Sequence, residues 1–298
     1  MATPGPRLPA VPGVQVEHRD VALSDGTRLH VAEAGAGAPL VLVHGWPQHW
    51  WAWRRVLPEL ARERRVLCPD LRGLGWSDAP PGAYAKDEWA SDLLALLDAL
   101  ELDRPDLAGH DWGGLVVLLA ALRAPERVRS VAALSVFHPW PSPPRPSVRT
   151  LAPLAYQPPL ATPLLGERLL RHAPQVVREL IRRGSHRTAR WTGDELDAYA
   201  RVLQDPARAR ASSALYRTFL LHEAARFATG RHAGERLRVP ALMLTGAADA
   251  VVGPPVLAGF EDHADRARTG VVERCGHFLP EERPDAVLIA LRDHLAAA

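Results

Sequence analysis

The chain between residues 105 and 120 passes from a short strand-like run, through a sharp turn, into an apolar helix-like run. The turn reads Gly109-His110-Asp111-Trp112-Gly113, and its two glycines let the backbone bend where a Cβ atom would clash. A strand, a tight turn and a helix in this order form an elbow that presents its central residue at the edge of a parallel sheet. The segment therefore favours a fold in which strands and helices alternate.

The same alternation extends over most of the chain. Apolar or alternating runs, which predict strands, occur at residues 14–22, 27–34, 39–44, 65–69, 106–109, 128–136, 241–245 and 270–274. Helical spacing at 50–62 and a strongly amphipathic pattern at 86–100 lie between them. Strands that alternate with helices predict an α/β fold with a mainly parallel, doubly wound sheet.

This alternation breaks between residues 139 and 238. The segment opens with a proline-rich stretch and continues with helical runs at 164–170, 175–183, 195–203 and 213–227, without a strand pattern. We interpret 139–238 as a helical cap inserted into a core made of 14–138 and 239–298. Residues 1–13 are rich in proline, and we expect them to form a flexible N-terminal arm.

Composition argues against several classes of function. The 298 residues carry a formal net charge of +2, which gives no strong field for binding nucleic acid. No apolar run reaches the roughly 18 residues of a membrane span, and the N-terminus lacks the apolar region of a signal peptide. Cys68 and Cys275 form no metal pattern or disulfide framework, which fits a cytoplasmic protein. Lys86 is the only lysine, and we interpret the arginine-rich composition as a compositional habit.

The central residue of the elbow, Asp111, indicates the chemistry. A carboxylate that attacks a saturated carbon forms an ester, which a base-activated water can hydrolyse. An aspartate at this position therefore points to substrates with an electrophilic saturated carbon, such as an epoxide or a carbon–halogen bond. The alternative is structural: Asp111 could simply cap the helix that begins at Gly113.

A second turn, His44-Gly45-Trp46-Pro47, follows the third predicted strand. Glycine there allows the backbone to approach a ligand closely. The N–H groups of Trp46 and Trp112 could then form an oxyanion hole, which would stabilise the tetrahedral intermediate when water attacks an ester of Asp111. The alternative interpretation is an ordinary turn between a strand and a helix.

An acid and a histidine follow the last two predicted strands. Asp249 ends the segment 244–249, and His277 lies in Cys275-Gly276-His277-Phe278. Side chains at the carboxyl ends of parallel strands converge on one crevice. His277 is a candidate general base for water, and Asp249 a candidate to orient its imidazole ring.

Other motifs are interpreted as structural. The glycine-rich loop Asp70–Asp78 lacks the lysine of a phosphate-binding loop and is expected to be held by hydrogen bonds. His110, beside Asp111, is expected to pack rather than react. Trp50, Trp51 and Trp53 are expected to pack between a helix and the sheet.

Together these motifs resemble the α/β-hydrolase superfamily and, within it, the epoxide hydrolases. The resemblance extends over nearly the whole chain from about residue 14. It implies an α/β-hydrolase fold with a cap inserted after the sixth strand, a triad of Asp111, Asp249 and His277, and no metal or cofactor. It further implies two cap tyrosines that hold and protonate the epoxide oxygen. We assign these to Tyr156 and Tyr216; Tyr84 lies in the core, and Tyr199 is expected to be at the surface or packed.

The predicted function is conversion of a small, apolar epoxide into a vicinal diol through an alkyl ester of Asp111. The main alternative is a haloalkane or haloacid dehalogenase with the same nucleophile. Trp112 could donate to a leaving halide, but many haloalkane dehalogenases have asparagine where this chain has Trp46. The arginine that grips a haloacid in haloacetate dehalogenases is missing after Asp111. A binding protein without catalytic activity is a further alternative, which the retention of all three triad residues disfavours.

Overall fold

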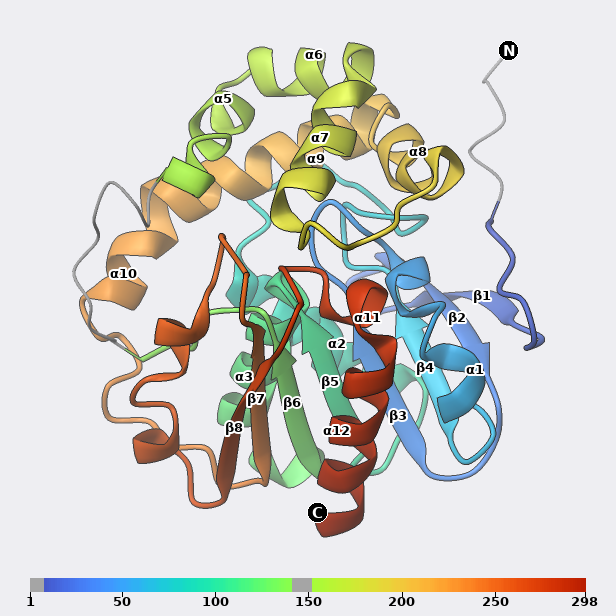
Figure 1. Cartoon of the computed structure of the whole chain (residues 1–298), viewed down its shortest axis with the longest axis vertical. Helices are drawn as coiled ribbons and strands as arrows, with labels where there is room; N and C mark the ends of the chain where they lie inside the picture. Colours follow the sequence, from blue (N-terminus) through green and yellow to red (C-terminus); the bar gives the residue numbers. More distant parts are fainter. Residues whose placement is uncertain (1–7, 141–151) are drawn as a thin grey trace.

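The computed structural model describes residues 8–140 and 152–298, and its centre is an eight-stranded sheet (Figure 1). The strands stand in the order β1-β2-β4-β3-β5-β6-β7-β8. Their bounds are β1 Glu17–Ala22, β2 Arg28–Ala34, β3 Pro39–Val43, β4 Arg65–Pro69, β5 Asp106–His110, β6 Ser130–Leu134, β7 Ala241–Gly246 and β8 Ala267–Val272. Strands β1 and β2 are antiparallel to their neighbours, and the other pairs from β4 to β8 are parallel. The sheet is therefore mostly parallel, as predicted.

The last strand differs from its predicted position. We expected a strand at 270–274, whereas β8 begins at Ala267 and pairs with β7 from Ala241↔Ala267 to Gly246↔Val272. β8 lies at the edge of the sheet, and only Val272 among its six residues is buried. An edge strand carries a weak apolar pattern, so the sequence places it poorly.

Helices cover both faces of the sheet (Figure 1). Helices α2 (Lys86–Ala99) and α3 (Trp112–Arg123) pack against each other and share one apolar core with the sheet. The second core lies beneath η1 (Trp50–Trp53), α1 (Leu57–Leu60), α11 (Leu279–Glu282) and α12 (Pro284–Ala297). The helical run expected at 50–62 is thus a 3-10 turn followed by one α-helical turn. Short 3-10 turns complete the core at Pro125–Arg127, Pro254–Leu257 and Glu261–His263.

A layer of helices lies over the carboxyl ends of the parallel strands (Figure 1). It contains a 3-10 turn at Ala152–Leu154, α5 Gln157–Ala161, α6 Leu165–His172, α7 Pro174–Gly184, α8 Gly193–Val202, α9 Pro206–Thr218, the π-helix η4 Phe219–Glu223 and α10 Ala224–Ala228. Thr192 and Glu195 form a capping box that starts α8, and the carboxylate of Asp205 accepts two N–H groups that start α9. The single helical run expected at 213–227 is therefore three elements. The proposed cap boundaries at 139 and 238 stay a prediction, and residues 141–151 lie outside the described part of the chain.

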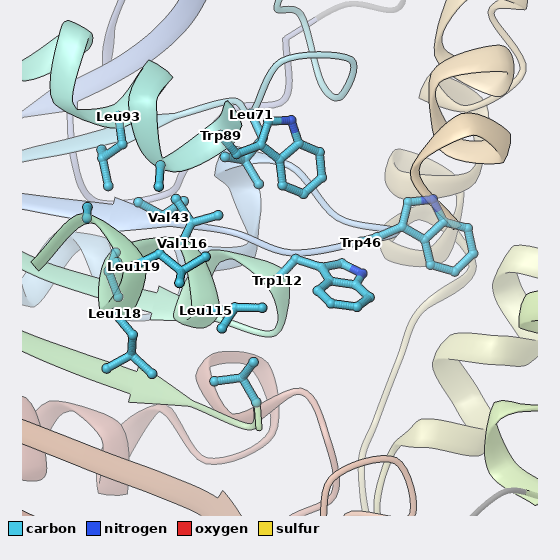
Figure 2. Packing of buried hydrophobic residues seen from close by; sticks show 14 of the residues in the cluster. Val43, Trp46, Leu71, Trp89, Leu93, Trp112, Leu115, Val116, Leu118 and Leu119 are labelled. Atoms are coloured by element: carbon cyan, nitrogen blue, oxygen red, sulfur yellow. The ribbon is translucent and has the colours of Figure 1, made fainter. Parts of the chain in front are cut away.

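The core between α3 and the sheet is packed with branched aliphatic side chains. Val43 of β3 and the side chains of Leu115, Val116 and Leu119 of α3 belong to this layer, as does Trp112 at the start of α3 (Figure 2). The helix α3 is apolar on every side because it is buried on every side. Packing of this kind fixes the start of α3, and hence the elbow that precedes it.

Part of the expected flexible arm is held against the core. Residues 1–7 lie outside the described part of the chain. Beyond them, Val11 is buried, and the indole N–H of Trp51 donates to the carbonyl of Ala10 over 3.0 Å. Within residues 8–140 and 152–298, no helix combines the length and the apolar character that a membrane span requires.

Candidate active site

The elbow places Asp111 in a backbone conformation that few residues adopt. Its φ is 51° and its ψ is −129°, between the end of β5 and the start of α3. The sharp bend requires the flanking glycines: a Cβ atom on Gly109 would lie 2.1 Å from the carbonyl oxygen of Gly113, and one on Gly113 would lie 2.2 Å from that of Val43. Strain of this kind is retained where the fold over-determines it, and it is common at functional sites.

The side chain of Asp111 does not cap α3. Among the described residues it makes no capping hydrogen bond, so that alternative is wrong. Its Oδ2 atom instead accepts the backbone N–H of Trp46 over 2.9 Å. A Cβ atom on Gly45 would lie 2.4 Å from Asp111, so only glycine lets this loop come so close. His44 holds the loop, because its Nδ1 donates to the carbonyl of Gly45 and its Nε2 accepts the N–H of Leu71.

His277 and Asp249 lie beside Asp111, as the order of motifs predicted. The Nδ1 atom of His277 is 3.0 Å from Oδ2 of Asp249, and its Nε2 atom is 3.6 Å from Oδ1 of Asp111. The other oxygen of Asp249 accepts the N–H groups of Val251 and Val252 over 2.8 and 2.9 Å. The imidazole of His277 therefore lies between two carboxylates, and that of Asp249 is held in place by the N–H groups of the loop that follows it.

The two carboxylates decide the charge of His277. Burial by itself would lower the pKa of His277, but Asp249 and Asp111 more than offset it and raise the pKa to about 10. For Asp249, burial favours the neutral acid, yet the charge and hydrogen bond of His277 hold its pKa below the usual value. The protonated imidazole of His277 is therefore favoured at neutral pH, next to Asp249 and Asp111.

The two tyrosines assigned from the cap meet above the elbow. The hydroxyl oxygens of Tyr156 and Tyr216 are 3.3 Å apart. Tyr156 stacks on the ring of Trp46 at 6.0 Å between centroids, and Tyr216 meets the same ring edge-on at 5.0 Å. Burial, and then the charge of Asp111, raise the pKa of Tyr156 to about 12. Burial, Tyr156 and Asp111 raise the pKa of Tyr216 well above its usual value. Both phenols thus keep their protons.

A cavity of about 200 Å³ opens beside these groups. Its wall combines core and cap residues: Trp46, Pro47, Tyr156, Leu180, Gly184, Val251, His277 and Phe278 are among them. Arg183 at this cavity pairs with Glu179 one helical turn away. The cavity is mainly apolar, and its polar side chains are the phenol of Tyr156, the imidazole of His277 and the guanidinium of Arg183.

The remaining candidates lie outside the cavity. Tyr84 is buried with its hydroxyl on the carbonyl of Pro80. Tyr199 is not at the surface; it is wholly buried and bonded to Arg54 and Glu281, where it joins α8 to the core. The Nε2 atom of His110 is 2.7 Å from the carbonyl oxygen of His277, and burial lowers the pKa of His110 to about 4.

The other structural interpretations are confirmed. Asp70 in the glycine-rich loop accepts the N–H groups of Trp50 and Trp76 and contacts Nδ1 of His30. Trp50 and Trp53 are wholly buried in the second core, with Trp51 packed against it.

The sequence did not reveal Glu282 as a support of the site. Its carboxylate accepts the N–H groups of Gly276, Phe278 and His186 over 2.9, 3.0 and 2.7 Å. It thereby fixes the loop that carries His277 and ties that loop to the cap. An acidic residue five positions after a candidate base is a weak signal, because surface helices carry many such residues.

Among residues 8–140 and 152–298, no three His, Cys, Asp or Glu side chains are grouped so that they could hold a metal ion. The reactive groups of the site are a carboxylate, an acid–histidine pair, two phenols and backbone N–H groups.

Comparison with known proteins shows the family to which the chain belongs. The α/β-hydrolase fold family matches residues 38–284. The soluble epoxide hydrolase of Corynebacterium sp. (strain C12) is 31% identical over 274 residues, which cover 90% of this chain and 93% of that protein. The bifunctional epoxide hydrolase 2 of Mus musculus is 29% identical, over 91% of this chain and 54% of the mouse protein, so the chain spans about half of that relative. The solved structure of the epoxide hydrolase CorEH without ligand has a TM-score of 0.84 at 27% identity and covers 95% of this chain and 99% of its own.

Proposed function

Because the chain belongs to the α/β-hydrolase family and, within it, to the epoxide hydrolases, we propose that it hydrolyses an epoxide to a vicinal diol through an ester on Asp111. The observation that supports this proposal is a pair of protonated phenols packed on the ring of Trp46, the residue whose backbone N–H binds the strained carboxylate of Asp111. A nucleophile and a proton donor on opposite sides are what ring opening requires.

In the first step, a carboxylate oxygen of Asp111 forms a bond to one epoxide carbon, and the bond from that carbon to the ring oxygen breaks. The ring oxygen takes a proton from Tyr156 or Tyr216. Because the pKa of Tyr156 is about 12 and that of His277 is about 10, the resulting phenolate draws its proton back from the imidazolium, through solvent. The step leaves a hydroxyalkyl ester, neutral phenols and a neutral imidazole.

Ester formation also prepares His277 to act as a base. The charge and hydrogen bond of Asp111 contribute to the raised pKa of His277, and both are lost when Asp111 becomes an ester. The pKa of His277 then falls towards neutrality, where imidazole is most effective as a general base. Asp249 remains in place and keeps the ring oriented.

In the second step, His277 takes a proton from water, and the water oxygen attacks the carbonyl carbon of Asp111. The N–H of Trp46, already 2.9 Å from Oδ2, stabilises the oxyanion, and the N–H of Trp112 at the start of α3 is the second donor. The intermediate collapses, and the diol leaves with the proton held by His277. The carboxyl group of Asp111 then returns a proton to His277, which closes the cycle.

The cavity supports a small epoxide with an apolar substituent. Rings and aliphatic side chains, among them those of Trp46, Leu180 and Phe278, line it. We do not propose dehalogenation, because the relatives described above are named epoxide hydrolases and because an epoxide oxygen, unlike a halide, needs the proton that a phenol can supply.

The experiment that tests the proposal is an ester trap. The His277→Gln variant is mixed with styrene oxide and with an alkyl bromide, and the intact mass is followed. We expect a stable adduct from the epoxide, mapped by peptide mass to Asp111, whereas the matched His277→Gln/Asp111→Asn variant gives none. Absence of any adduct in the single variant would contradict the ester mechanism.

A second measurement distinguishes the ester from direct attack by water. A single turnover of the wild-type enzyme in heavy-oxygen water is expected to place the label on Asp111 rather than in the first diol released. Label that enters the diol directly would overturn the proposal.

A further inference from the structure

The single lysine of the chain is buried behind the active site. Lys86 begins α2 and has no exposed surface. Its Nζ atom is 2.7 Å from Oε2 of Glu223, and its backbone N–H donates to Oε1 of the same carboxylate over 2.8 Å. A buried ion pair rarely adds stability over an apolar pair of equal volume. Its presence therefore calls for another explanation.

Three aromatic rings surround the ammonium group. Nζ of Lys86 lies 4.6 Å from the ring centroid of Trp112, 5.2 Å from that of Phe219 and 5.8 Å from that of Trp89. At these distances a cation is attracted to the face of a ring. The charged groups that face Lys86 are Glu223 and, at longer range, Asp111.

The partners of Lys86 come from both halves of the site. Trp112 directly follows Asp111 at the elbow. Phe219 and Glu223 form the ends of the π-helix η4, in which the N–H of Ala224 donates to the carbonyl of Phe219. This wide turn continues α9, the helix that carries Tyr216. π-turns within helices occur frequently at functional sites.

The contacts around Trp112 complete this connection. Its ring packs edge-on against Phe219 at 4.8 Å and against Tyr216 at 6.5 Å. Trp112 thus lies between the buried ammonium and the phenol. A shift of Glu223 or Phe219 would change both the ring of Trp112 and the end of α9.

We propose that Lys86 is a positioning residue for epoxide opening: its ammonium, held by Glu223 over the ring of Trp112, sets the position of Tyr216 relative to Asp111. This inference rests on the proposed function. A purely structural role of Lys86 would affect every reaction of Asp111 equally. The proposed role affects only the reaction that uses a phenol as proton donor. Burial lowers the pKa of Lys86 to about 8, although Glu223 opposes the shift, so the ammonium form predominates at neutral pH.

The test measures the rate of ester formation on Asp111 in the His277→Gln background, with styrene oxide and with an alkyl bromide. Opening of the epoxide uses Tyr216 as one of its two proton donors, whereas the bromide leaves without a proton. Addition of Lys86→Met is expected to slow the epoxide reaction about 10- to 100-fold, as a small misplacement of a catalytic group does, and the bromide reaction less than about twofold. Equal slowing of both, or of neither, would overturn the proposal.

A double variant controls for loss of stability. Lys86→Met/Glu223→Gln removes both charges and keeps an oxygen for the N–H of Lys86, so it is expected to fold. It should remain slow on the epoxide; recovery of the parent rate would show that the ion pair is only structural. Tyr199→Phe, which removes a cap–core contact on the far side of the cap, is the matched control and should leave the ratio of the two rates unchanged.

The single lysine also provides a spectroscopic measurement. Lysine labelled with ¹³C at Cε gives one side-chain signal, which should titrate near pH 8 and move when Asp111 is alkylated. A signal that titrates like a free lysine and ignores alkylation would overturn the inference. If the His277→Gln parent itself forms no ester with the epoxide, the proposed function fails, and this outcome is distinct from failure of the role of Lys86.

Discussion

The half of the site that the sheet carries is held differently from the half that the cap carries. In the sheet half, backbone groups hold both carboxylates: Trp46 donates to Asp111, and two N–H groups of the following loop hold Asp249, which in turn holds the ring of His277. In the cap half, Tyr156 and Tyr216 are placed by ring contacts and by each other. Backbone hydrogen bonds are directional and closely spaced, whereas ring packing tolerates small displacements.

This difference suggests separate roles for the two halves: the sheet half would carry the reaction common to all substrates, and the cap half would set the preference among substrates. Asp111, His277 and the N–H of Trp46 already lie next to one another before substrate arrives, as the electrostatic stabilisation of the proposed mechanism requires. The phenols instead lie on cap elements, and α9, which carries Tyr216, continues into η4, whose Glu223 pairs with Lys86 of the core. Changes in the sheet half should therefore abolish turnover on every substrate, and changes in the cap half should depend on the substrate.

The largest effect is expected from Asp111→Asn. Loss of the nucleophile should reduce turnover by about 10⁵-fold, the scale found when a covalent catalyst loses its attacking group. The fold should tolerate the change, because asparagine adopts positive φ more readily than most residues. Turnover on the epoxide panel and thermal unfolding check this, and an unstable variant would contradict the second part.

The two phenols should have smaller and unequal effects on different electrophiles. Tyr156→Phe and Tyr216→Phe should each slow ring opening about 10- to 100-fold, and the double variant more than either, because one phenol partly replaces the other as proton donor. Alkylation of Asp111 by an alkyl bromide should hardly change. Equal losses on the epoxide and the bromide would remove the distinction between the two halves.

A pH measurement tests the electrostatic coupling inside the sheet half. The pKa of His277, about 10 in the native enzyme, should fall in Asp111→Asn, because the neutral amide no longer favours the imidazolium. The raised pKa of the folded state means that His277 contributes stability below about pH 6.5, which is lost as the pH rises through about 10. Histidine resonances followed by NMR, with unfolding at several pH values, should show both effects diminished in the variant.

The smallest effect on turnover is expected from Tyr199→Phe. This change leaves a buried carboxylate, Glu281, without one hydrogen-bond donor and should cost about 1–3 kcal/mol of unfolding free energy. Turnover on a small epoxide should change less than about threefold, because Tyr199 contacts neither phenol in the cavity. Denaturant unfolding and kcat on the same preparation check this; a large loss of kcat would show that this anchor also positions the phenols.

Local sequence predicted the sheet half well because each of its residues follows a strand. Asp111 lies after β5, Asp249 after β7 and His277 after β8, and parallel strands deliver their carboxyl ends to one edge whatever the intervening chain does. The glycines beside Asp111 and Trp46 could also be interpreted from the sequence. A Cβ atom at these positions would clash with residues nearby in the chain or at the end of the adjacent strand. The edge strand β8, with its weak apolar pattern, begins three residues before its predicted position.

The cap half depended on contacts between distant residues. The resemblance of short motifs identified Tyr156 and Tyr216, but their meeting requires α5 and α9 to pack side by side, which helical periodicity alone does not specify. Lys86 shows most clearly what sequence cannot predict. Its sequence context is an ordinary helix start, and the composition of the chain suggested only a preference for arginine over lysine. The sequence by itself predicted that Asp111, the pair of Asp249 and His277, and the turn at Trp46 would lie together. Tertiary structure alone decided that the one ammonium of the chain is buried between the cap and the nucleophile, because burial of a charge depends on partners 26 and 137 residues away.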